Sequence, residues 1–434
     1  MTTTRRNVLA GMAAATAVGA SPGFAATRRA MPKGFLWGAA ISAHQSEGND
    51  VNSDSWLLEN LPETVYKDPS GDACDSYNRY ELDFAIARSI GLNCYRFGIE
   101  WARIEPEPGK FSRAELDHYA RVLDSCRGHG LLPIVSYNHF TVPRWFAMRG
   151  GWEAADGADL FARYCERVTH ALGGRIGMAS PFNEANIQLL VKMLRGSATP
   201  EYRAKRVAMI AAAARATNSP QFSSLLFADP DRVDAHLLDA HAKAYQAIKA
   251  GPGDFPVGVT LTTQAIEPVG DDSIAPQMEK MLYGDWWKAV DASDFVGVQA
   301  YTRMRFDAKG AVSPPAGAAM TGAGYEYYPQ ALGHVIRLAA RSTKKPIYVT
   351  ESGIAGDDDT RRIAWLDASI AEVEKCIAEG IGVKSYIYWS LLDNFEWTQG
   401  YGQHFGLVSV DRETFVRTPK PSVQHFARLI GDRK

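Results

Sequence analysis

Residues 346–353 read PIYVTESG, and this stretch decides the fold. Its β-forming, mostly apolar residues lead to Glu351, and Gly353 ends the run two places later. A buried strand of a parallel sheet is a continuous apolar run, and α/β barrels carry their catalytic groups at the carboxyl ends of such strands. Glu351 is therefore either a functional acid or an acid that is paired for structural reasons.

A second stretch of the chain has the same form. Residues 178–186 read MASPFNEAN, in which a short strand ends on Glu184. Two strands that each end on a glutamate favour a functional pair over two unrelated structural acids.

Further β-rich runs alternate with segments of helical periodicity along the chain. We expect strands at Phe35–Ala43, Cys94–Trp101, Leu132–Phe140, Met178–Glu184, Phe255–Thr263, Phe295–Arg303, Ile347–Glu351 and Ser385–Leu392. This order is that of a closed parallel barrel, whereas a doubly wound sheet favours a G-x-G-x-x-G turn where residues 38–40 read GAA. The sequence therefore predicts an α/β protein, a single (β/α)₈ TIM barrel at residues 27–434.

The segments between these strands carry apolar residues at helical spacing. In the first of them Tyr80, Phe84, Ala87 and Ile90 share one face, and Gly91 provides the stop. We expect helices at Arg79–Ile90, Arg113–Arg127, Asp156–Leu172, Asp231–Ala250, Gln277–Val290, Pro329–Ala340 and Arg361–Glu379.

Long connections follow several of the strand ends. They are Glu47–Cys74, Asn186–Pro230, Asp307–Gly324 and Asn394–Pro421. Loops of this length in a compact domain are usually functional or disordered. In a barrel all of them would open onto the carboxyl face of the strands.

The first 26 residues differ in composition from the rest. Arg5 and Arg6 precede a weakly apolar run to about Ala20, and small residues follow up to Ala25 and Ala26. This pattern predicts a twin-arginine signal peptide at residues 1–26 and a periplasmic or secreted protein. The alternative is a frayed or membrane-anchored amino terminus, although the run is too short to span a bilayer.

The composition is that of an ordinary soluble globular protein. The net charge is −2 and the basic residues are scattered, so we expect neither nucleic acid nor, after signal removal, a membrane as partner. The five cysteines have no CxxC spacing, and no H-E-x-x-H occurs, so we expect no metal and no cofactor. The oligomeric state stays open.

In a barrel, Glu184 and Glu351 would project into the same mouth. A pair of carboxylates facing one pocket suits cleavage of a glycosidic bond, in which one attacks the sugar carbon and the other protonates the leaving oxygen. The residues alone leave two alternatives open: a divalent-metal site and plain structural acids.

The chain resembles glycoside hydrolase family 1, the retaining β-glucosidases and their relatives, from Gly34 to about Phe426. Beyond the two glutamate strands, the resemblance rests on residues 35–48 (FLWGAAISAHQSEG), 95–104 (YRFGIEWARI), 139–140 with 143–145 (HF, PRW) and 386–397 (YIYWSLLDNFEW). These motifs follow each other in the order of the family's strand ends, and they cover nearly the whole mature chain.

The resemblance implies that Glu184 is the general acid/base and Glu351 the nucleophile. Arg96 can hold Glu351 ionised, because a nearby cation lowers a carboxyl pKa, and Tyr301 can donate a hydrogen bond to the same carboxylate. The alternatives are a structural ion pair for Arg96 and core packing for Tyr301.

The resemblance also implies a set of residues that bind the sugar. Four of them carry hydrogen-bonding side chains, which a polyol needs, and two are aromatic, one offering a flat apolar face and the other an N–H. Each alone could be a satisfied buried polar residue or core packing. They are Gln45, His139, Asn183 and Glu396, together with Trp389 and Trp397.

The chain departs from the family pattern at several positions. Ala185 replaces a proline, Phe140 a tryptophan, Gln299 an asparagine and His404 an arginine, and residues 187–230 lack the expected Gly-Tyr and Ala-Pro-Gly pattern. These changes surround the sugar and its leaving group. They concern substrate preference more than chemistry.

The sequence thus predicts an exo-acting retaining β-glycosidase, foremost a β-glucosidase, which hydrolyses neutral β-linked glycosides through a covalent glycosyl-enzyme. A phosphorylated sugar is not expected, because Glu396 would repel it. The alternatives are a preference for galacto- or fuco-configured sugars, a transglycosylase on the same site, and a carbohydrate-binding pseudoenzyme.

Overall fold

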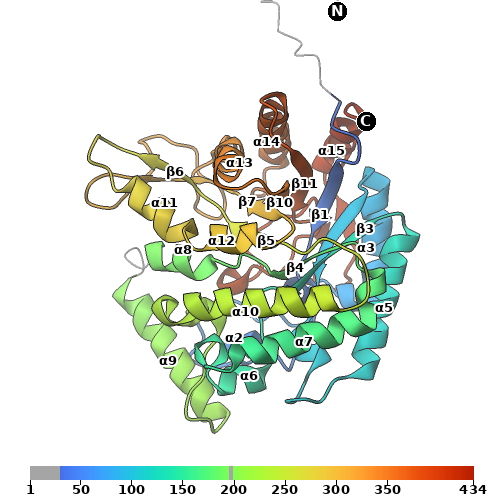
Figure 1. Ribbon diagram of the computed structural model, residues 1–434, viewed down its shortest axis with the longest axis vertical. Helices are drawn as coiled ribbons and strands as arrows, with labels where there is room; N and C mark the ends of the chain where they lie inside the picture. Colours follow the sequence, from blue (N-terminus) through green and yellow to red (C-terminus); the bar gives the residue numbers. More distant parts are fainter. Residues whose placement is uncertain (1–29, 195–198) are drawn as a thin grey trace, which may run out of the picture.

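The computed structural model describes residues 30–194 and 199–434 (Figure 1). The predicted signal peptide, residues 1–26, lies outside the described residues. Met31 donates a backbone hydrogen bond to Arg433, 3.0 Å, so the beginning and the end of the described chain lie side by side.

An eight-stranded parallel sheet forms the centre of the molecule. Its strands are β1 (Leu36–Ala40), β2 (Cys94–Gly98), β3 (Leu132–Asn138), β4 (Met178–Phe182), β5 (Val259–Thr262), β7 (Val296–Gln299), β10 (Ile347–Ser352) and β11 (Val383–Trp389). Their order is β4-β3-β2-β1-β11-β10-β7-β5, so the first strand pairs with the last strand of the sheet and the sheet curls. The predicted (β/α)₈ barrel is confirmed.

The barrel closes between β4 and β5 without a regular ladder. Ala179 forms an isolated parallel bridge with Val257. Two residues further on the same side of β4, Pro181 has no N–H to donate. The Thr260 hydroxyl instead donates to the Phe182 carbonyl at 2.7 Å, and Ala185 N–H donates to the Thr260 carbonyl at 2.9 Å.

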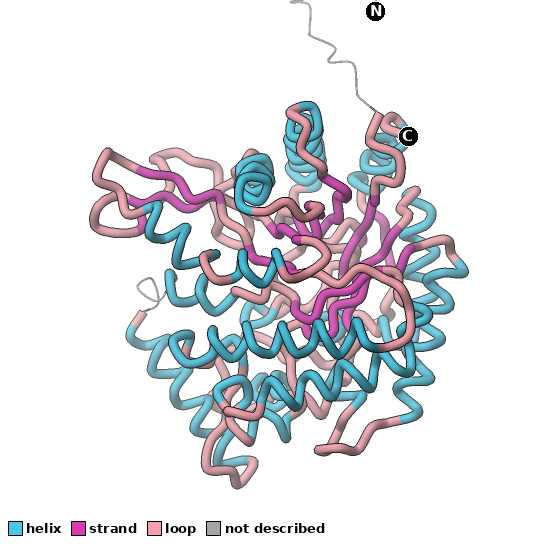
Figure 2. Tube along the Cα trace, in the orientation of Figure 1, coloured by secondary structure: helices cyan, strands magenta, loops and turns pink. Residues whose placement is uncertain are grey.

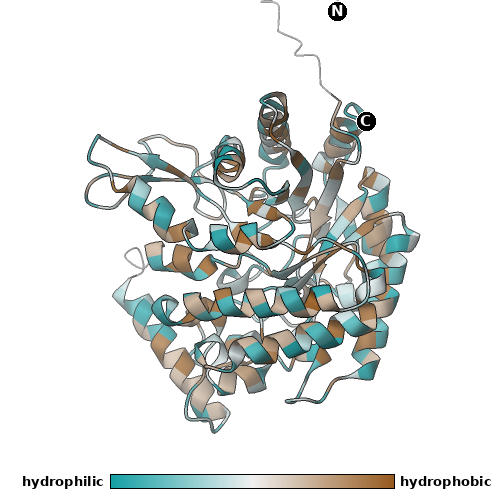
Figure 3. Ribbon diagram, viewed as in Figure 1, coloured by the Kyte–Doolittle hydropathy of each residue, from teal (hydrophilic) through white to brown (hydrophobic). Residues whose placement is uncertain are grey.

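Helices surround the strands, as Figure 2 shows. The long ones are α3 (Ser76–Ile90), α5 (Arg113–Gly128), α7 (Gly157–Leu172), α9 (Pro200–Ala216), α10 (Pro230–Ala250), α13 (Ala331–Ser342), α14 (Asp359–Ala378) and α15 (Pro421–Gly431). The apolar stripe of α7, Phe161, Tyr164, Cys165 and Val168, is buried at helical spacing. Figure 3 shows the corresponding alternation of brown and teal residues along α7 and α10.

Shorter elements complete the chain. The helices are α1 (Ala43–Ser46), α2 (Asp54–Glu59), α4 (Trp101–Ile104), α6 (Arg144–Met148), α8 (Ile187–Leu194), α11 (Ala275–Tyr283) and α12 (Trp286–Asp291). The 3₁₀ turns are η1 (Gly151–Glu153), η2 (Gly173–Arg175), η4 (Leu225–Phe227) and η5 (Trp397–Gln399). The remaining strands are β6 (Ala265–Pro268), β8 (Arg303–Phe306), β9 (Ala311–Val312), β12 (Val408–Val410) and β13 (Arg417–Pro419).

Three predicted elements differ from the structure. The helix predicted at Gln277–Val290 is two helices, α11 and α12, which are separated at Gly284, a residue that weakens a helix interior. The strand predicted at Phe295–Arg303 ends at Gln299, and the chain continues into β8, which pairs with β6 and β9 outside the barrel. The long connection at Asn186–Pro230 contains α8, α9 and η4.

Alternation along the strands separates two cores. On β2, Cys94 packs inside the barrel, whereas Tyr95 and Phe97 point outward and meet Phe84 of α3. Arg96 lies on the same face as Cys94 and therefore points into the barrel. All five cysteines are buried and unpaired. Within the described residues, no helix is both long and apolar enough to cross a bilayer.

Candidate active site

Both predicted glutamates line one cavity at the carboxyl ends of the strands. Glu351 lies in β10, and Glu184 follows the end of β4. The cavity has a volume of about 580 Å³. Of the other predicted site residues, six share its wall: His139, Asn183, Tyr301, Trp389, Glu396 and Trp397. Gln45 and Arg96 lie behind this wall and are buried.

Donors converge on the carboxylate of Glu351. Arg96 Nη1 lies 2.5 Å from Oε1, Gln299 Nε2 donates to the same oxygen at 2.6 Å, and the Tyr301 hydroxyl donates to Oε2 at 2.6 Å. Burial raises the pKa of Glu351, and the Arg96 guanidinium and the Tyr301 hydroxyl oppose that rise. A cation contacts Glu351, and all three groups donate to its oxygens, which favours the ionised form. Of the two glutamates in the cavity, Glu351 is therefore the one that is ionised.

Glu184 has the opposite environment. Burial raises its pKa to about 8, and the neighbouring charge of Glu351 adds to the rise, while the Thr262 hydroxyl acts against it. A carboxyl group with this pKa retains its proton at neutral pH. The two glutamates of one cavity therefore differ in protonation, as general acid and nucleophile must.

A chain of hydrogen bonds continues from Arg96 into the wall. Arg96 Nη2 lies 2.5 Å from Asn183 Oδ1, and Asn183 Nδ2 lies 3.1 Å from His139 Nε2. Burial, aided by the positive charge of Arg96, lowers the pKa of His139 well below its usual range. A neutral His139 can accept the amide proton of Asn183, so the ring is fixed without carrying a charge.

The contact of Gln299 was missed by the sequence reasoning, which noted the residue only as a departure. Its amide donates to Asn183 Oδ1 at 2.7 Å as well as to Glu351. Gln299 ends β7 opposite Glu351 of β10 in the parallel register. This pairing of the two strand ends is what brings the Gln299 amide to the Glu351 carboxylate.

Glu396 forms the far polar end of the cavity. Gln45 Nε2 donates to its Oε2 at 3.2 Å and to the Phe395 carbonyl at 2.7 Å. Burial raises the pKa of Glu396 to about 8, the charge of Glu351 contributes, and Gln45 acts against the rise. Glu396 is thus a hydrogen-bond donor as well as an acceptor at neutral pH.

Aromatic rings cover one side of this end. The Trp389 ring stacks on His139, with 5.5 Å between the ring centroids and 26° between the planes. The Trp397 ring also stacks on His139, with 6.2 Å between the centroids and 19° between the planes. Phe140, a departure from the family pattern, lines the cavity and contacts Trp397 at 5.2 Å. The cavity thus combines flat apolar faces with hydroxyl-binding groups, as a sugar site requires.

Some backbone positions of the cavity wall are strained. Phe140, Glu184 and Trp397 have φ values of 74°, 44° and 46°, in the left-handed region that side chains other than glycine rarely adopt. Such positions concentrate at functional sites, where the surrounding structure imposes them. At Glu184, the bonds from Ala185 N–H to Thr260 and from Ile187 N–H to the Glu184 carbonyl hold the turn.

The other departures lie at different distances from the cavity. Ala185 is 3% exposed and packs below it. His404 is not part of the cavity wall; its Nδ1 pairs with Asp357 Oδ1 at 2.5 Å beside a separate depression. The expectation that His404 lies near the sugar is therefore wrong, because the adjacent Phe405 occupies the wall instead.

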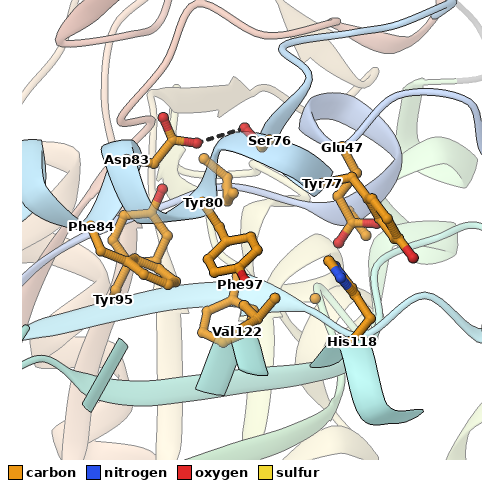
Figure 4. Close-up of a pocket in the computed structure, with 13 residues that line it drawn as sticks. Glu47, Ser76, Tyr77, Tyr80, Asp83, Phe84, Tyr95, Phe97, His118 and Val122 are labelled. Carbon is orange, nitrogen blue, oxygen red and sulfur yellow. Dashed lines mark hydrogen bonds between the residues drawn. The ribbon is translucent and has the colours of Figure 1, made fainter. Parts of the chain in front are cut away.

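A second cavity lies outside the barrel, between β2, α3 and α5 (Figure 4). Tyr77 and His118 stack there with 3.7 Å between centroids, and Ser76 donates to Asp83 at 2.8 Å. Its volume is about 20 Å³, enough for a water molecule but not for a sugar. In the described part of the chain, no cluster of histidine, cysteine, aspartate or glutamate is placed to hold a metal ion.

Comparisons with known proteins agree with this geometry. The model of glycosyl hydrolase family 1 matches residues 27–291 and 291–434. Beta-glucosidase A of Thermotoga maritima is 29% identical, over 92% of this chain and 97% of its own, and the 1,4-beta-D-glucan glucohydrolase of Thermotoga neapolitana is 27% identical over 92% and 98%.

A solved structure is similar along the same length. The apo structure of a beta-glucosidase designated 1317 superimposes with a TM-score of 0.88 at 43% identity, covering 92% of this chain and 98% of that one. The family match spans nearly the whole described chain, including both glutamate strands. The resemblance inferred from the motifs is confirmed: the chain belongs to glycosyl hydrolase family 1 and is an O-glycoside hydrolase.

Proposed function

We propose that the protein is an exo-acting retaining β-glycosidase, foremost a β-glucosidase, that hydrolyses neutral β-linked glycosides. The observation that carries this proposal is the contrast between the two glutamates. Glu351 receives donors from Arg96, Gln299 and Tyr301, whereas burial leaves Glu184 protonated at neutral pH.

The first step would form a sugar ester on Glu351. A carboxylate oxygen of Glu351 attacks the anomeric carbon, the bond from that carbon to the leaving oxygen breaks, and Glu184 donates its proton to that oxygen. Arg96 and Tyr301 keep the attacking group ionised and oriented until the bond forms.

The second step would return the enzyme to its starting state. Glu184, now ionised, removes a proton from water, and the water oxygen attacks the anomeric carbon from the face that the aglycone has left. The ester bond to Glu351 breaks, so that two inversions give net retention. No other reactant is needed.

The glycone would be a neutral hexose. Gln45, His139, Asn183 and Glu396 offer hydrogen bonds for its hydroxyls, and Trp389 offers a ring face. The buried, proton-retaining Glu396 suits a hydroxyl, to which it can donate or from which it can accept.

Proton NMR during hydrolysis of an aryl β-glucoside tests the proposal. The β-anomer of glucose is expected to form first, and mass spectrometry of enzyme trapped with a 2-deoxy-2-fluoro glycoside is expected to locate the sugar on Glu351. A first-formed α-anomer would show inversion, and absence of turnover on any aryl β-glycoside would show a binding protein. A panel of gluco-, galacto- and fuco-configured substrates ranks the glycones.

The proposal includes export. The paired Arg5 and Arg6 before an apolar run support a twin-arginine signal peptide at residues 1–26 and a periplasmic or secreted enzyme.

A further inference from the structure

The active-site cavity extends well beyond the glutamates. Its outer wall is built by α8 (Ile187–Leu194), by η4 (Leu225–Phe227) and by the hairpin of β8 and β9. These elements belong to connections between barrel strands. They line the same cavity as Glu184, the residue to which the proposed function assigns protonation of the leaving oxygen.

Helix α8 presents an apolar stripe to this cavity. Ile187, Leu190, Val191 and Leu194 all line it, and their spacing of i, i+3, i+4 and i+7 places them on one face. The buried residue Gln188 lies off this stripe and donates to the Leu225 carbonyl. The stripe thus faces an open cavity, where exposed apolar surface marks a binding site.

Other elements add apolar side chains to the same outer wall. Phe227 of η4 and Met304 of β8 line it, and Tyr202 and Tyr325 lie at 36% and 45% exposure. These side chains offer ring faces and thioether surface, and the two tyrosines add one hydroxyl group each.

The charged residues of this wall bind each other. Arg303 donates to Glu326 through Nε at 2.9 Å and through Nη2 at 2.7 Å, and its Nη1 donates to Glu267 at 2.9 Å. A second sugar unit would need hydrogen-bond partners along its length. The polar side chains that line this part of the cavity besides the ion pair include Gln264, Arg305 and the two tyrosines.

We propose that the outer wall binds an apolar aglycone, an aryl group or an alkyl chain of about six carbons or more, in preference to a second sugar. This inference rests on the proposed function and names its substrate class. Burial of a methylene group strengthens binding roughly fourfold, so an alkyl aglycone that follows the α8 stripe gains from each carbon.

A series of n-alkyl β-glucosides tests the proposal, because alkanols differ little as leaving groups. From methyl to octyl, kcat/KM is expected to rise about two- to fourfold per methylene until the wall is covered. Octyl glucoside is then expected to exceed cellobiose at least about tenfold, although cellobiose has the better leaving group. A flat series, or a preference for cellobiose, would overturn the inference and leave the proposed function standing.

A matched pair of leucines supplies the control. Leu194 ends the α8 stripe at 43% exposure, and Leu82 on α3 is 45% exposed outside the cavity. Leu194→Gln is expected to lower kcat/KM for octyl glucoside about threefold or more and to leave methyl glucoside unchanged, whereas Leu82→Gln changes neither. Equal behaviour of the two variants would contradict the assignment. If the wild-type protein hydrolyses none of these glycosides, the proposed function itself is refuted.

A second inference comes from a different part of the site, the buried ring of His44. Its Nδ1 lies 3.0 Å from Asp50 Oδ2 and its Nε2 lies 3.3 Å from Glu59 Oε2, and the residue is 1% exposed. Only the doubly protonated ring can donate to both carboxylates. Burial acts to lower the pKa of His44, and the hydrogen bonds to Asp50 and Glu59 raise it to about 10.

The imidazole ring of His44 is the first of three stacked rings, and the other two, Trp397 and His139, line the active-site cavity, the sugar pocket of the proposed function. His44 stacks on Trp397 with 5.8 Å between centroids and 7° between planes, and Trp397 in turn stacks on His139. The next residue after His44 is Gln45, which binds Glu396. A cation against a tryptophan face stabilises that ring in place.

We infer that the imidazolium of His44 is a positioning residue for the sugar pocket, which it holds through Trp397 and Gln45. The groups that face it are Asp50, Glu59, Asp54, Glu100 and the hydroxyl of Ser53 at 3.5 Å. Burial raises the pKa of Asp54 to about 6 and that of Glu100 to about 8, so the charge balance around His44 changes through neutral pH.

The variants His44→Gln and His241→Gln separate positioning from packing. His241 is also buried and hydrogen-bonded, to Ser293 at 3.0 Å, but lies outside the cavity. His44→Gln is expected to raise KM for an aryl glucoside about tenfold with kcat changed less than about threefold, because uniform binding is lost. His241→Gln is expected to lower Tm and leave KM unchanged.

An unchanged KM in folded His44→Gln would overturn this inference. If that variant does not fold, Asp50→Asn keeps the ring and weakens its charge, and KM is then expected to rise about threefold. An unchanged KM in Asp50→Asn, with a lowered Tm, would show a purely structural pair.

Discussion

Arg96 contacts Glu351 at 2.5 Å across the barrel interior, where both side chains are almost completely buried. Breaking a buried pair leaves an uncompensated charge, so this contact fixes the protonation state of Glu351 as well as its orientation. The pH profile of the enzyme should therefore report on Arg96.

Removal of the cation should move the acidic limb of activity. Without Arg96 the pKa of Glu351 rises, so the ionised form is lost at a higher pH as the pH falls. Arg96→Met is expected to shift the acidic limb of kcat/KM upward by about one pH unit or more. The control is Arg417→Met, which breaks another buried pair, with Asp83 at 2.9 Å, outside the cavity. That variant should lower Tm without moving the limb; a shift of equal size in both would contradict this prediction.

Loss of the acid should depend on the leaving group. Glu184→Gln is expected to lower kcat/KM by about 10²–10⁴ for an alkyl glucoside and far less for a dinitrophenyl glucoside, which leaves without a proton. Activity of the wild type requires protonated Glu184, so it should fall as the pH rises through about 8. The alkaline limb for alkyl substrates should disappear in the variant. Equal losses on both substrates would refute the assigned role.

Gln299 should contribute to the rate. Its amide donates to Glu351 and Asn183 at 2.6 and 2.7 Å, and a hydrogen bond to a charged group is worth roughly 1.5–3 kcal/mol. Gln299→Ala is expected to lower kcat/KM about 10- to 100-fold on an aryl glucoside. The exposed Gln330 provides a control, since Gln330→Ala should be neutral. Wild-type kinetics in Gln299→Ala would show that the contact is only packing.

Discrimination against a 6-phosphoglucoside should grow with pH. Burial raises the pKa of Glu396 to about 8, so its negative charge, and the repulsion of a phosphate dianion, develops as the pH rises through that value. The phosphate is already a dianion above about pH 7. The ratio of kcat/KM for the neutral and phosphorylated aryl glucosides is therefore expected to rise between pH 7 and pH 9, and to stay flat in Glu396→Gln. A wild-type ratio that stays flat between pH 7 and pH 9 would show that Glu396 does not select against phosphate.

Export should require both arginines. Replacing Arg5 and Arg6 by lysine keeps the positive charge but removes the pair that characterises the twin-arginine signal. Cell fractionation is expected to find the variant in the cytoplasm and the wild-type protein outside it. A matched variant with Arg28→Lys, beyond the predicted cleavage point, should be exported normally.

The sequence was most informative where strands end in unusual residues. Glu184 and Glu351 could be placed because a charged residue interrupts an apolar run, and the strand order followed from alternation with helices. Arg96 could be assigned to the same mouth because it lies at the end of the second strand, in a motif that resembles the family's.

Other features depended on contacts between distant parts of the chain. Gln299 is a neutral residue in an apolar strand, and only the register with β10 shows that it meets Glu351. The position of His404 followed from the path of the loop after Asn394, which carries no periodic signal. Helix α8 is too short for reliable recognition, and its apolar stripe faces a cavity rather than the core.

The closure of the barrel at Thr260 has a consequence for the position of Glu184. At the junction of β4 and β5, the Thr260 hydroxyl rather than a backbone N–H donates to the Phe182 carbonyl, next to Pro181. Ala185, which follows Glu184, donates to the carbonyl of the same Thr260. One residue of β5 thus holds both sides of the turn that carries Glu184, so a substitution at Thr260 is expected to displace that carboxyl group from outside the cavity wall.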